Sequence, residues 1–401
     1  MKIKNSNRRN IWFFAFLTLI VIITAGLVIW RYSNLTNKSD TNGQLNTSQP
    51  VKQVAKAGSI IHFAAMGDML AHDTIIANAK TENGYDFGKY FANILSSYSN
   101  ANVIFCNQEG LSAGEQYGIS GYPSFNAPTQ FSSGLQSGAG CNLINLANNH
   151  MGDKGVDATN ATVDVWNKLK PLGFSGANKS ATDQQNASFS EANGIKIGFV
   201  SFADFNNNKL TPGYSVNVYH DEALVRSLVT QARTNADVVI VSMHWGVEDS
   251  NTVSADQQTQ VDLLSSLGVD VIIGTGPHVL QKVETVTRAD GGKMVIWYSL
   301  GNMLSSQLNI KELIGGIAQF DITKVSQGKV NISNLTFTPA YMHYEWTAAE
   351  ATNSDLLARK NAMIYLLDSA ASPLSRSLFN TTIAEQRQYV VDTLGPEVTV
   401  K

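Results

Sequence analysis

The sequence predicts an α/β fold, because short apolar runs typical of buried strands alternate with segments of helical spacing from residue 59 onward. Polar side chains of the types that bind metal ions or transfer protons follow directly after several of these runs. Open α/β sheets bind their ligands at the carboxyl ends of the strands. The sequence therefore predicts one site that is assembled from several loops at one edge of a sheet.

Composition limits the classes of function that fit the chain. Its 401 residues are 43% hydrophobic, which is enough for a substantial core. Charged residues make up 15%, against about 25% in an average protein, so uncharged polar residues must form much of the surface. The net charge of −3 gives no electrostatic basis for binding nucleic acid, and we expect no nucleic-acid partner.

The amino terminus predicts a membrane anchor. Residues 11–30 carry no charge, and at about 1.5 Å per residue a helix of this length spans a bilayer core of roughly 30 Å. The preceding residues 1–10 are basic, with no acidic residue among them. This charge pattern predicts a single-pass signal anchor in the cell membrane, with its amino terminus in the cytoplasm and the remaining chain extracytoplasmic. A cleaved signal peptide is the competing interpretation, but the apolar segment is long for one.

Three further regions follow the expected anchor. Residues 31–58 are rich in Ser, Asn, Thr and Gln without apolar periodicity, which predicts a flexible linker. Residues 59–345 carry the alternating strands and helices and form the predicted main domain. Residues 346–401 are predicted to be a helical carboxyl-terminal extension, with helices over 356–369 and 383–394.

The elements of the main domain are assigned from hydrophobic periodicity. Buried strands are expected over 60–66, 101–106, 143–146, 195–203, 237–243, 270–273 and 293–298. Helices are expected over 87–95, 129–135, 156–169, 222–236 and 255–267. Two alternating segments, 317–322 and 330–337, are expected to be strands that complete a second sheet.

The residues at the strand ends form the candidate site. They are Asp68, His72, Glu109, Asn148, Asn149, His150, His244, Glu248, His278 and Asn302. Each one has a structural explanation when taken alone, such as a helix cap for Asp68 or a turn for His278. Their common position makes a joint coincidence improbable, and the mixture of carboxylate, carboxamide and imidazole groups suits a dinuclear site for divalent metal. The other histidines, His62, His220 and His343, are expected to be structural.

The cysteines give little information about function. Cys106 and Cys141 are too few for a disulfide framework, and each lies in or beside an expected strand. Two buried free thiols are therefore expected, and a single bridge is the alternative.

Six motifs, in order along the chain, resemble those of the CapA family of poly-γ-glutamate capsule biosynthesis proteins. The motifs are Gly67–Asp68, Asn107–Glu109, Asn145–His150, His244–Glu248, Gly274–Gln281 and Tyr298–Asn302. The resemblance covers about residues 60–340. It implies a relationship to calcineurin-like metallophosphatases and a four-layer α/β/β/α sandwich, here behind the amino-terminal transmembrane helix.

The resemblance also implies roles for individual residues. Asp68 and His278 would bind one metal ion, Asn149 and His244 would bind a second, and Glu109 would bridge the two. The cofactor would be a divalent metal, Mn, Fe or Zn, present as one or two ions.

The remaining candidates would assist the ligands. His150 would act as the general acid near the leaving group. His72, Asn148, Glu248 and Asn302 are candidates for supporting the ligands or contacting the substrate. His72 is the weaker fit, because it follows Asp68 by four residues whereas metallophosphatases place a histidine two residues after this aspartate.

Departures from the family pattern concern the second metal position. The family commonly has histidine at one or both of the positions that Thr275 and Gly276 occupy here, and the residues beside Glu109 also differ. Loss of an imidazole ligand weakens a metal position, so we expect one tight site and one weak or empty site.

Two main hypotheses of function follow, and a third stays open. The first is a membrane-anchored, extracytoplasmic protein that makes or exports a capsule-type surface polymer and retains a metal-dependent phosphoesterase-type site. The second is a non-catalytic binding subunit of a membrane polymer-synthesis complex with a degenerate metal site. The third is hydrolysis of an amide bond by the same metal chemistry. The expected partners are the membrane, other subunits of such a complex and an anionic surface polymer.

Overall fold

The computed structural model describes residues 58–326 and 328–401. The expected anchor at residues 11–30, the basic segment before it and all but the last residue of the expected linker lie outside these residues. Within the described ranges, no helix is both long and apolar enough to cross a membrane. The described residues belong to one compact unit.

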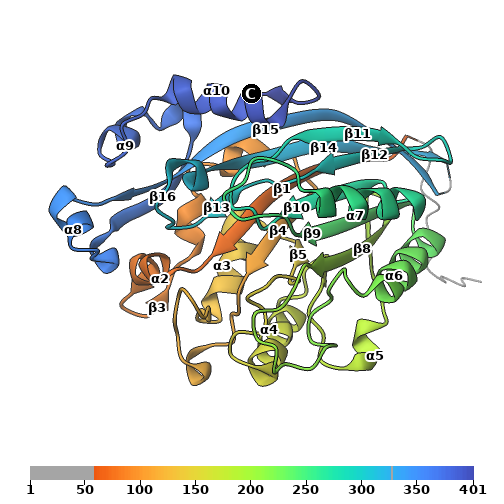
Figure 1. Cartoon of the computed structure of the whole chain (residues 1–401), viewed down its shortest axis with the longest axis horizontal. Helices are drawn as coiled ribbons and strands as arrows, with labels where there is room; N and C mark the ends of the chain where they lie inside the picture. The colour runs from red at the N-terminus through yellow and green to blue at the C-terminus, as the bar shows by residue number, and fades with distance from the viewer. Residues whose placement is uncertain (1–57, 327) are drawn as a thin grey trace, which may run out of the picture. The chain divides into compact units, whose positions relative to one another are not determined.

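The first sheet carries the amino-terminal strand at its centre (Figure 1). In spatial order it contains β16 (Lys360–Leu366), β15 (Lys329–Glu345), β14 (Ile314–Ser326), β1 (Ile60–Leu70), β4 (Val103–Glu109), β5 (Leu143–Asn145) and β6 (Gly173–Ser175). Two short strands extend it, β13 (Asn302–Leu304) beside β1 and β17 (Thr399–Val400) beside β15. The strands β1, β4, β5 and β6 run parallel, whereas β14, β15 and β16 are antiparallel additions.

The second sheet has a parallel centre with an antiparallel strand at each edge. Its spatial order is β11 (Val283–Thr287), β12 (Lys293–Trp297), β10 (Val271–Thr275), β9 (Val238–His244), β8 (Ile195–Ala203) and β7 (Ser188–Ala192). A separate small hairpin pairs β2 (Lys80–Thr81) with β3 (Gly84–Tyr85).

The two sheets pack face to face through large aromatic side chains. Phe105 on β4 meets Phe199 on β8 edge-on, with ring centroids 6.2 Å apart. Trp297 on β12 stacks on Phe320 and Phe337 of the first sheet, at 6.3 and 6.4 Å. All five side chains are buried, so this interface forms the centre of the larger hydrophobic core.

Helices cover the outer faces of both sheets. On the second sheet, apolar residues of α6 (Glu222–Asn235) and α7 (Ala255–Ser266) form a second core with the outward side chains of the strands. On the first sheet, α3 (Gln130–Ala139) and α4 (Val156–Leu169) contribute to the main core. The α/β class predicted from the sequence is therefore confirmed.

The remaining helices lie in the connections and in the carboxyl-terminal region. They are α2 (Asp73–Ala79), α5 (Ala181–Gln184), α8 (Ala348–Thr352), α9 (Ala371–Ser375) and α10 (Ile383–Leu394). The last of these agrees with its predicted range. Single 3-10 turns occur at Glu115–Tyr117, Ile310–Leu313, Leu356–Ala358 and Leu367–Ser369.

Three predictions about elements are wrong. The helix expected over 87–95 is two 3-10 turns, Gly88–Phe91 and Leu95–Tyr98, because Gly, Asn and Ser residues are poor helix formers and one turn at a time suffices to bury the aromatic side chains. The segment 356–369, expected to be a helix, contains the strand β16 instead. Hydrogen bonds to the edge of β15 override the local helical propensity of this segment. The extension is thus not wholly helical.

The third error concerns sheet membership. The strands expected at 317–322 and 330–337 are the long hairpin of β14 and β15, and they join the first sheet beside β1 instead of completing the second. Alternation alone shows that one face of a strand is buried, but it does not identify the sheet to which the strand pairs.

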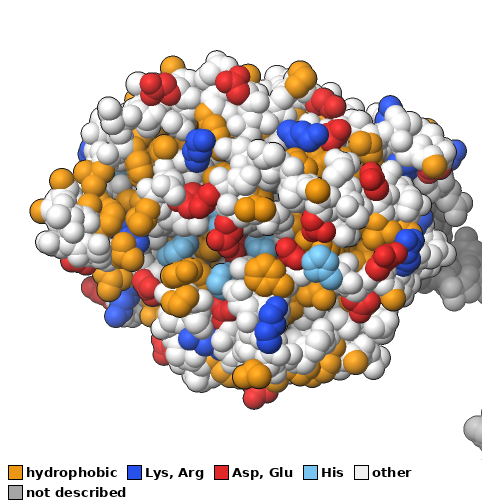
Figure 2. Space-filling model, in the orientation of Figure 1, with side chains coloured by type: hydrophobic (Ala, Val, Ile, Leu, Met, Phe, Trp, Pro, Cys, Tyr) orange, Lys and Arg blue, Asp and Glu red, His pale blue; other side chains and the backbone are white. Residues whose placement is uncertain are grey.

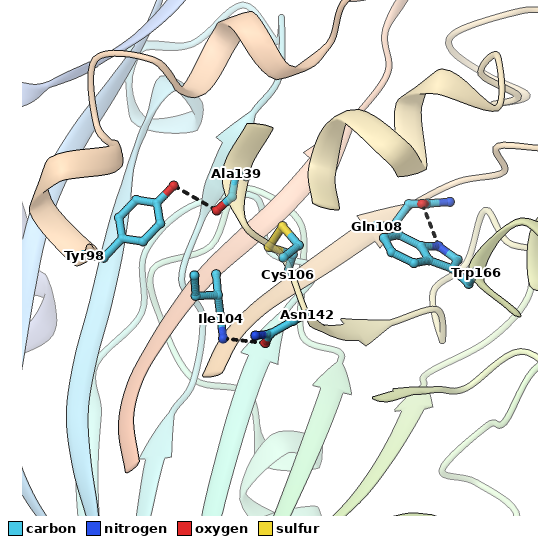
Figure 3. The surroundings of a disulfide bond; sticks show 8 residues. Tyr98, Ile104, Cys106, Gln108, Ala139, Asn142 and Trp166 are labelled. Carbon is cyan, nitrogen blue, oxygen red and sulfur yellow. Dashed lines mark hydrogen bonds between the residues drawn. A yellow bond between two sulfur atoms is a disulfide. The ribbon is translucent and has the colours of Figure 1, made fainter. Parts of the chain in front are cut away.

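The prediction of two free thiols is also wrong. Cys106 on β4 and Cys141 just before β5 form a disulfide with their Cα atoms 5.8 Å apart (Figure 3). Both cysteine side chains are fully buried. On the same strand, Gln108 Oε1 accepts a hydrogen bond from Trp166 Nε1 of the helix α4. Adjacent parallel strands bring the two Cα atoms within bridging distance, which the separation of 35 residues in sequence does not reveal.

Candidate metal centre

Alternation along β4 separates structural residues from site residues. Cys106 and Gln108 face the outer helices, whereas Phe105 faces the second sheet, and period-2 alternation places Asn107 and Glu109 on the same side as Phe105. The polar pair therefore lies at the carboxyl end of the interface between the sheets, where the apolar core stops.

Neighbouring strands bring the other candidates to the same place. On β1, Asp68 is in register with Asn107, so Asp68 and Glu109 come from adjacent parallel strands. From the second sheet, His244 ends β9, and His278 follows the end of β10. Strand ends from two sheets thus converge at one edge of the sandwich.

The first group of side chains consists of Asp68, Glu109 and His278. One ligand atom from each lies within 4.8 Å of the other two, and all three side chains are buried. His278 Nδ1 lies 3.1 Å from Asp68 Oδ2, and His278 Nε2 lies 3.8 Å from Glu109 Oε1. Two carboxylates and an imidazole at this spacing can hold a divalent cation.

A second group shares Glu109 with the first. His244 Nε2 lies 3.7 Å from Glu109 Oε1 and 3.1 Å from Asn149 Oδ1. The structure therefore brings all five predicted ligands together, and Glu109 stands between the two groups as the resemblance implied. Their function as ligands stays a prediction.

Glu109 provides the test of whether these residues fit a metal ion. Both of its carboxylate oxygens are buried and have no hydrogen-bond partner among the described residues. Burial raises the pKa of Glu109 well above its ordinary range; the nearby His278 opposes this shift, and the charge of Asp68 adds to it. A buried carboxylate without a partner is costly, and a divalent cation between the two groups would satisfy both oxygens. The available oxygen and nitrogen donors therefore fit the divalent metal that the resemblance implied.

Asp68 is held rigidly by its surroundings. Gly67 lies so close to the loop after β12 that an added Cβ would sit 1.9 Å from the carbonyl oxygen of Gly301. Asn107 Nδ2 donates to Asp68 Oδ1 at 2.6 Å, and Asn145 Nδ2 donates to Asn107 Oδ1 at 2.9 Å. Burial would raise the pKa of Asp68, but its hydrogen bond to His278 and the neighbouring charges lower it below the ordinary value.

The chain of carboxamides behind Asp68 was not predicted. Asn107 and Asn145 belong to the motifs that resemble the CapA family, but no role was predicted for either. Their position at the ends of adjacent strands was the available signal, because ligating carboxylates need hydrogen-bond donors to fix their orientation.

His278 occupies an uncommon backbone conformation, with φ of 61°. Its Nδ1 lies 3.0 Å from Asn302 Oδ1 as well as close to Asp68, so Nε2 is left to face Glu109. Burial opposes a charge on this imidazole, but the carboxylates of Glu109 and Asp68 outweigh burial and raise the pKa of His278 to about 10. Asn302 is a positioning partner of His278, as one of its two predicted roles requires.

The pKa of His244 is shifted in the opposite direction from that of His278. Burial lowers the pKa of His244 to about 4, although the charge of Asp68 opposes this shift, so the ring is neutral and able to donate a lone pair. Its Nδ1 lies 3.1 Å from the hydroxyl of Thr275 and 3.4 Å from Asn107 Nδ2. Thr275, which stands at a position where the family often has histidine, therefore orients an existing imidazole.

Gly276 explains why no imidazole is accommodated at the next position. Its φ is 108°, and an added Cβ would lie 2.8 Å from the carbonyl oxygen of Trp245. Its backbone N–H donates to Asp68 Oδ2 at 3.1 Å. A side chain here would require the backbone to shift and would disturb the support of Asp68.

His150 lies beside these groups and has a partner that the sequence analysis missed. Its Nδ1 lies 2.8 Å from Asp153 Oδ2, and Asp153 also accepts from the backbone N–H of Phe125 at 2.7 Å. The imidazole packs against the Phe125 ring with centroids 4.7 Å apart. A carboxylate three residues after a candidate acid, within one turn, was the signal that could have identified Asp153.

The remaining predicted residues have different surroundings. Asn148 is fully buried and braces the backbone, since Oδ1 accepts from Gly110 and Nδ2 donates to Gln108. His72 packs against Phe125 at 5.2 Å, and its Nδ1 accepts from Ser306. No direct contact of either with the five ligands is present among the described hydrogen bonds and ion pairs.

Glu248 and the histidines expected to be structural complete the set. Glu248 is exposed and lines a pocket beside His244. His62 and His220 form exposed pairs with Asp321 and Asp204, and His343 is buried in the first sheet, so none of the three joins the centre. On the face shown in Figure 2, imidazole and carboxylate side chains gather across the middle, between apolar side chains.

Comparison with known proteins agrees with the motif set. Residues 62–307 match the model of the family described as bacterial capsule synthesis protein PGA_cap. The chain belongs to this family. The matched region contains every strand end that contributes to the candidate centre.

Two curated relatives extend the comparison. The PGA biosynthesis protein CapA of Bacillus subtilis (strain 168) is 30% identical over 207 residues, covering 49% of this chain and 52% of the relative. The capsule biosynthesis protein CapA of Bacillus anthracis is 32% identical over 176 residues, covering 42% and 41%. The matched part of the chain thus spans about half the length of these relatives or less.

Similar solved structures are distant. The NAD nucleotidase NadN of Haemophilus influenzae is 10% identical with a TM-score of 0.44, covering 86% of this chain and 58% of that protein. A hypothetical protein from Thermus thermophilus is 13% identical with a TM-score of 0.42, covering 70% and 99%.

Proposed function

We propose that this family member takes part in the synthesis or export of a capsule-type surface polymer and carries a divalent-metal-dependent phosphoesterase-type site. Family membership supports the connection with capsule synthesis. The buried group of Asp68, Glu109 and His278 supports the metal site. The observation that carries the proposal is that both oxygens of Glu109 are buried without a partner among the described residues.

The five predicted ligands would hold the ion or ions. Asp68 and His278 lie on one side of Glu109, and Asn149 and His244 lie on the other. When bound, a divalent ion supplies Lewis-acid activation of a phosphoryl group and of water. Manganese, iron and zinc all suit this mixture of oxygen and nitrogen donors.

The residues of the chain supply orientation and the proton. Asp153 holds His150 through Nδ1, which leaves Nε2 as the atom that protonates the departing oxygen of the substrate. The backbone N–H of Phe125 holds the Asp153 carboxylate in place. His150 is therefore the proposed general acid, and Asp153 is its positioning residue.

We also propose that the folded part lies outside the cell membrane, anchored by residues 11–30. The uncharged length of this segment and the basic residues before it support the anchor. The disulfide between Cys106 and Cys141 adds independent support, because structural disulfides form mainly in oxidising, extracytoplasmic environments. The partners proposed in this setting are other subunits of a polymer-synthesis complex and the anionic polymer.

One observation favours a second function. Thr275 and Gly276 leave the side of Asn149 and His244 with fewer ligands than the family pattern provides, and Gly276 has no room for a side chain. A non-catalytic subunit that uses the same cleft for binding is therefore the alternative proposal. It shares the anchor and the partners but not the reaction.

Hydrolysis of 2′,3′-cyclic AMP, a phosphodiester whose alkoxide leaving group needs a proton, by the purified 401-residue chain in detergent, with and without added Mn²⁺, separates these proposals. The phosphoesterase proposal predicts Mn²⁺-dependent turnover, with kcat reduced about 10²- to 10⁴-fold in His150→Ala. Asp153→Asn should give a smaller loss of the same kind. His62→Ala is the matched control, because this imidazole pairs with Asp321 near the start of β1, at the opposite end of the strand from Asp68.

The binding-subunit proposal predicts a different pattern. No turnover would occur with any metal, and polymer formation in the producing bacterium would survive His150→Ala but not deletion of residues 1–30. Polymer formation that is lost in His150→Ala, together with Mn²⁺-dependent turnover, would exclude this alternative.

A further inference from the structure

A pocket of 320 Å³ opens directly beside the candidate centre. Asn149 and His244 line it on the side of the metal ligands, and Gly276 lines it where the family often has an imidazole. Any substrate that reaches the centre from this side must place part of its structure in the pocket.

Two of the apolar side chains in the pocket wall are exposed to solvent, whereas Trp245 is buried. Phe205 and Val247 line the pocket and are 43% and 58% exposed, which is unusual for large apolar side chains next to a buried polar cluster. Phe205 also lines an adjoining pocket, in which Lys209 Nζ lies 5.3 Å from the ring centroid. Lys209 does not line the pocket at the centre, so Phe205 offers an open ring surface there.

Two carboxylates belong to the polar part of the wall, those of Asp204 and Glu248. Asp204 Oδ1 already pairs with His220 Nε2 at 2.7 Å, whereas no hydrogen bond or ion pair of Glu248 occurs among the described residues. Within the described ranges, no Lys or Arg lines this pocket. Carboxylates accept hydrogen bonds from hydroxyl groups, whereas they repel an anionic chain.

We propose that this pocket is a subsite for a neutral, hydroxyl-bearing sugar ring of the substrate. The exposed ring of Phe205 provides an apolar surface for the carbon face of the sugar, and the carboxylate of Glu248, which has no partner among the described residues, accepts bonds from its hydroxyls. The inference rests on the proposed function, because it names the group that would be held beside the phosphoryl centre. It places the anionic polymer outside this pocket.

Saturation-transfer NMR tests the subsite by direct binding, in a detergent without a sugar headgroup. The probes are methyl α-glucopyranoside and N-acetylglucosamine, with tri-γ-glutamate and benzyl alcohol as the anionic and the purely apolar comparators. Both sugars should bind the 401-residue chain, and Phe205→Ala should weaken their binding about fivefold or more. Glu248→Gln should weaken binding by a smaller factor.

Leu210→Ala is the matched control, since Leu210 is 94% exposed nearby and lines neither pocket. The same spectra in EDTA separate the subsite from the reaction. Sugar binding that persists in EDTA and falls in Phe205→Ala supports the subsite, even if the chain never hydrolyses a phosphoester. The proposal is overturned if neither sugar binds, if Phe205→Ala changes nothing, or if tri-γ-glutamate or benzyl alcohol binds more tightly than the sugars.

Discussion

Buried carboxylates at the two ends of the strands have different kinds of partner. At the amino ends of β9 and β10, Asp237 and Asp270 come directly before the strands and meet cations from the chain itself. Lys324 Nζ lies 2.7 Å from Asp237, and Arg233 and Arg288 lie 2.8 and 2.6 Å from Asp270. Each of these two carboxylates has a partner of opposite sign.

At the carboxyl ends, Asp68 and Glu109 are buried together, and no Lys or Arg forms an ion pair with either among the described residues. The basic side chains that face them there are the imidazoles of His244 and His278, and both oxygens of Glu109 lack a hydrogen bond within the described part of the chain. The same fold thus pairs its buried carboxylates with Lys and Arg at one end and with imidazoles at the other. The proposed metal site accounts for this difference, and it implies a cost in the stability of the metal-free protein.

The amino end gives the largest expected effect. Replacing Asp270 by Ala leaves Arg233 partly buried without its carboxylate and leaves Arg288 with only the exposed Asp290. It also removes the acceptor for the N–H of Val239. We expect the free energy of unfolding to fall by about 3–5 kcal/mol in urea titrations. A loss below about 1 kcal/mol would mean that the amino end does not depend on this pairing.

The disulfide shows how the strand that carries Glu109 is braced from outside the centre. A double Cys106→Ala, Cys141→Ala variant should lose about 2–4 kcal/mol, because the bridge closes a loop of 35 residues in the unfolded chain. The measurement is urea unfolding of the variant beside oxidised wild type. Equal stability of the two proteins would show that packing alone braces β4.

Glu109→Gln should have the opposite sign to Asp270→Ala. In EDTA, the variant replaces a costly buried carboxylate by an uncharged isostere and should unfold at a higher temperature, by an amount equivalent to about 1–2 kcal/mol. With Mn²⁺ present, wild type should gain stability and the variant should gain much less. A variant that is less stable than wild type in EDTA would contradict the comparison.

The smallest expected effect is a loss of stability at low pH that depends on Asp237. Burial would raise the pKa of Asp237, but its hydrogen bonds to Lys324, Lys196 and Gly328 lower it below the ordinary value. A lowered pKa gives stability that is present above the unfolded pKa, near 4, and is lost as the pH falls through the folded value. Wild type should therefore exceed Asp237→Asn in stability at pH 7, and this difference should shrink below about pH 4. If the difference in stability does not change with pH, then it comes from packing and not from the charge of Asp237.

Much of the centre could be predicted from the sequence because its residues follow apolar runs directly. Asp68, Glu109, His244 and His278 each end or follow a buried strand, so the topology of the fold determines that they converge. The α/β class was predictable for the same reason, since strong periodicity identifies long buried elements.

The features that could not be predicted depend on tertiary contacts. The pairing of Cys106 with Cys141 and the place of β14 and β15 in the first sheet depend on which strands become neighbours. Strand β16 forms because an edge of β15 is free to pair, against its local helical pattern. The spacing of three residues between His150 and Asp153 could have suggested their contact. The sequence does not show, however, in which direction the two side chains point.

The metal content of the purified 401-residue chain tests the central claim most directly. Elemental analysis after mild dialysis should find one or two divalent ions per chain in wild type and a clear loss in Asp68→Ala. One ion would agree with a weakened position beside Thr275 and Gly276, and two would mean that His244 and Asn149 suffice there. No bound metal in wild type, with Asp68→Ala indistinguishable from it, would contradict the claim that the carboxyl end of the sheets is built for a cation.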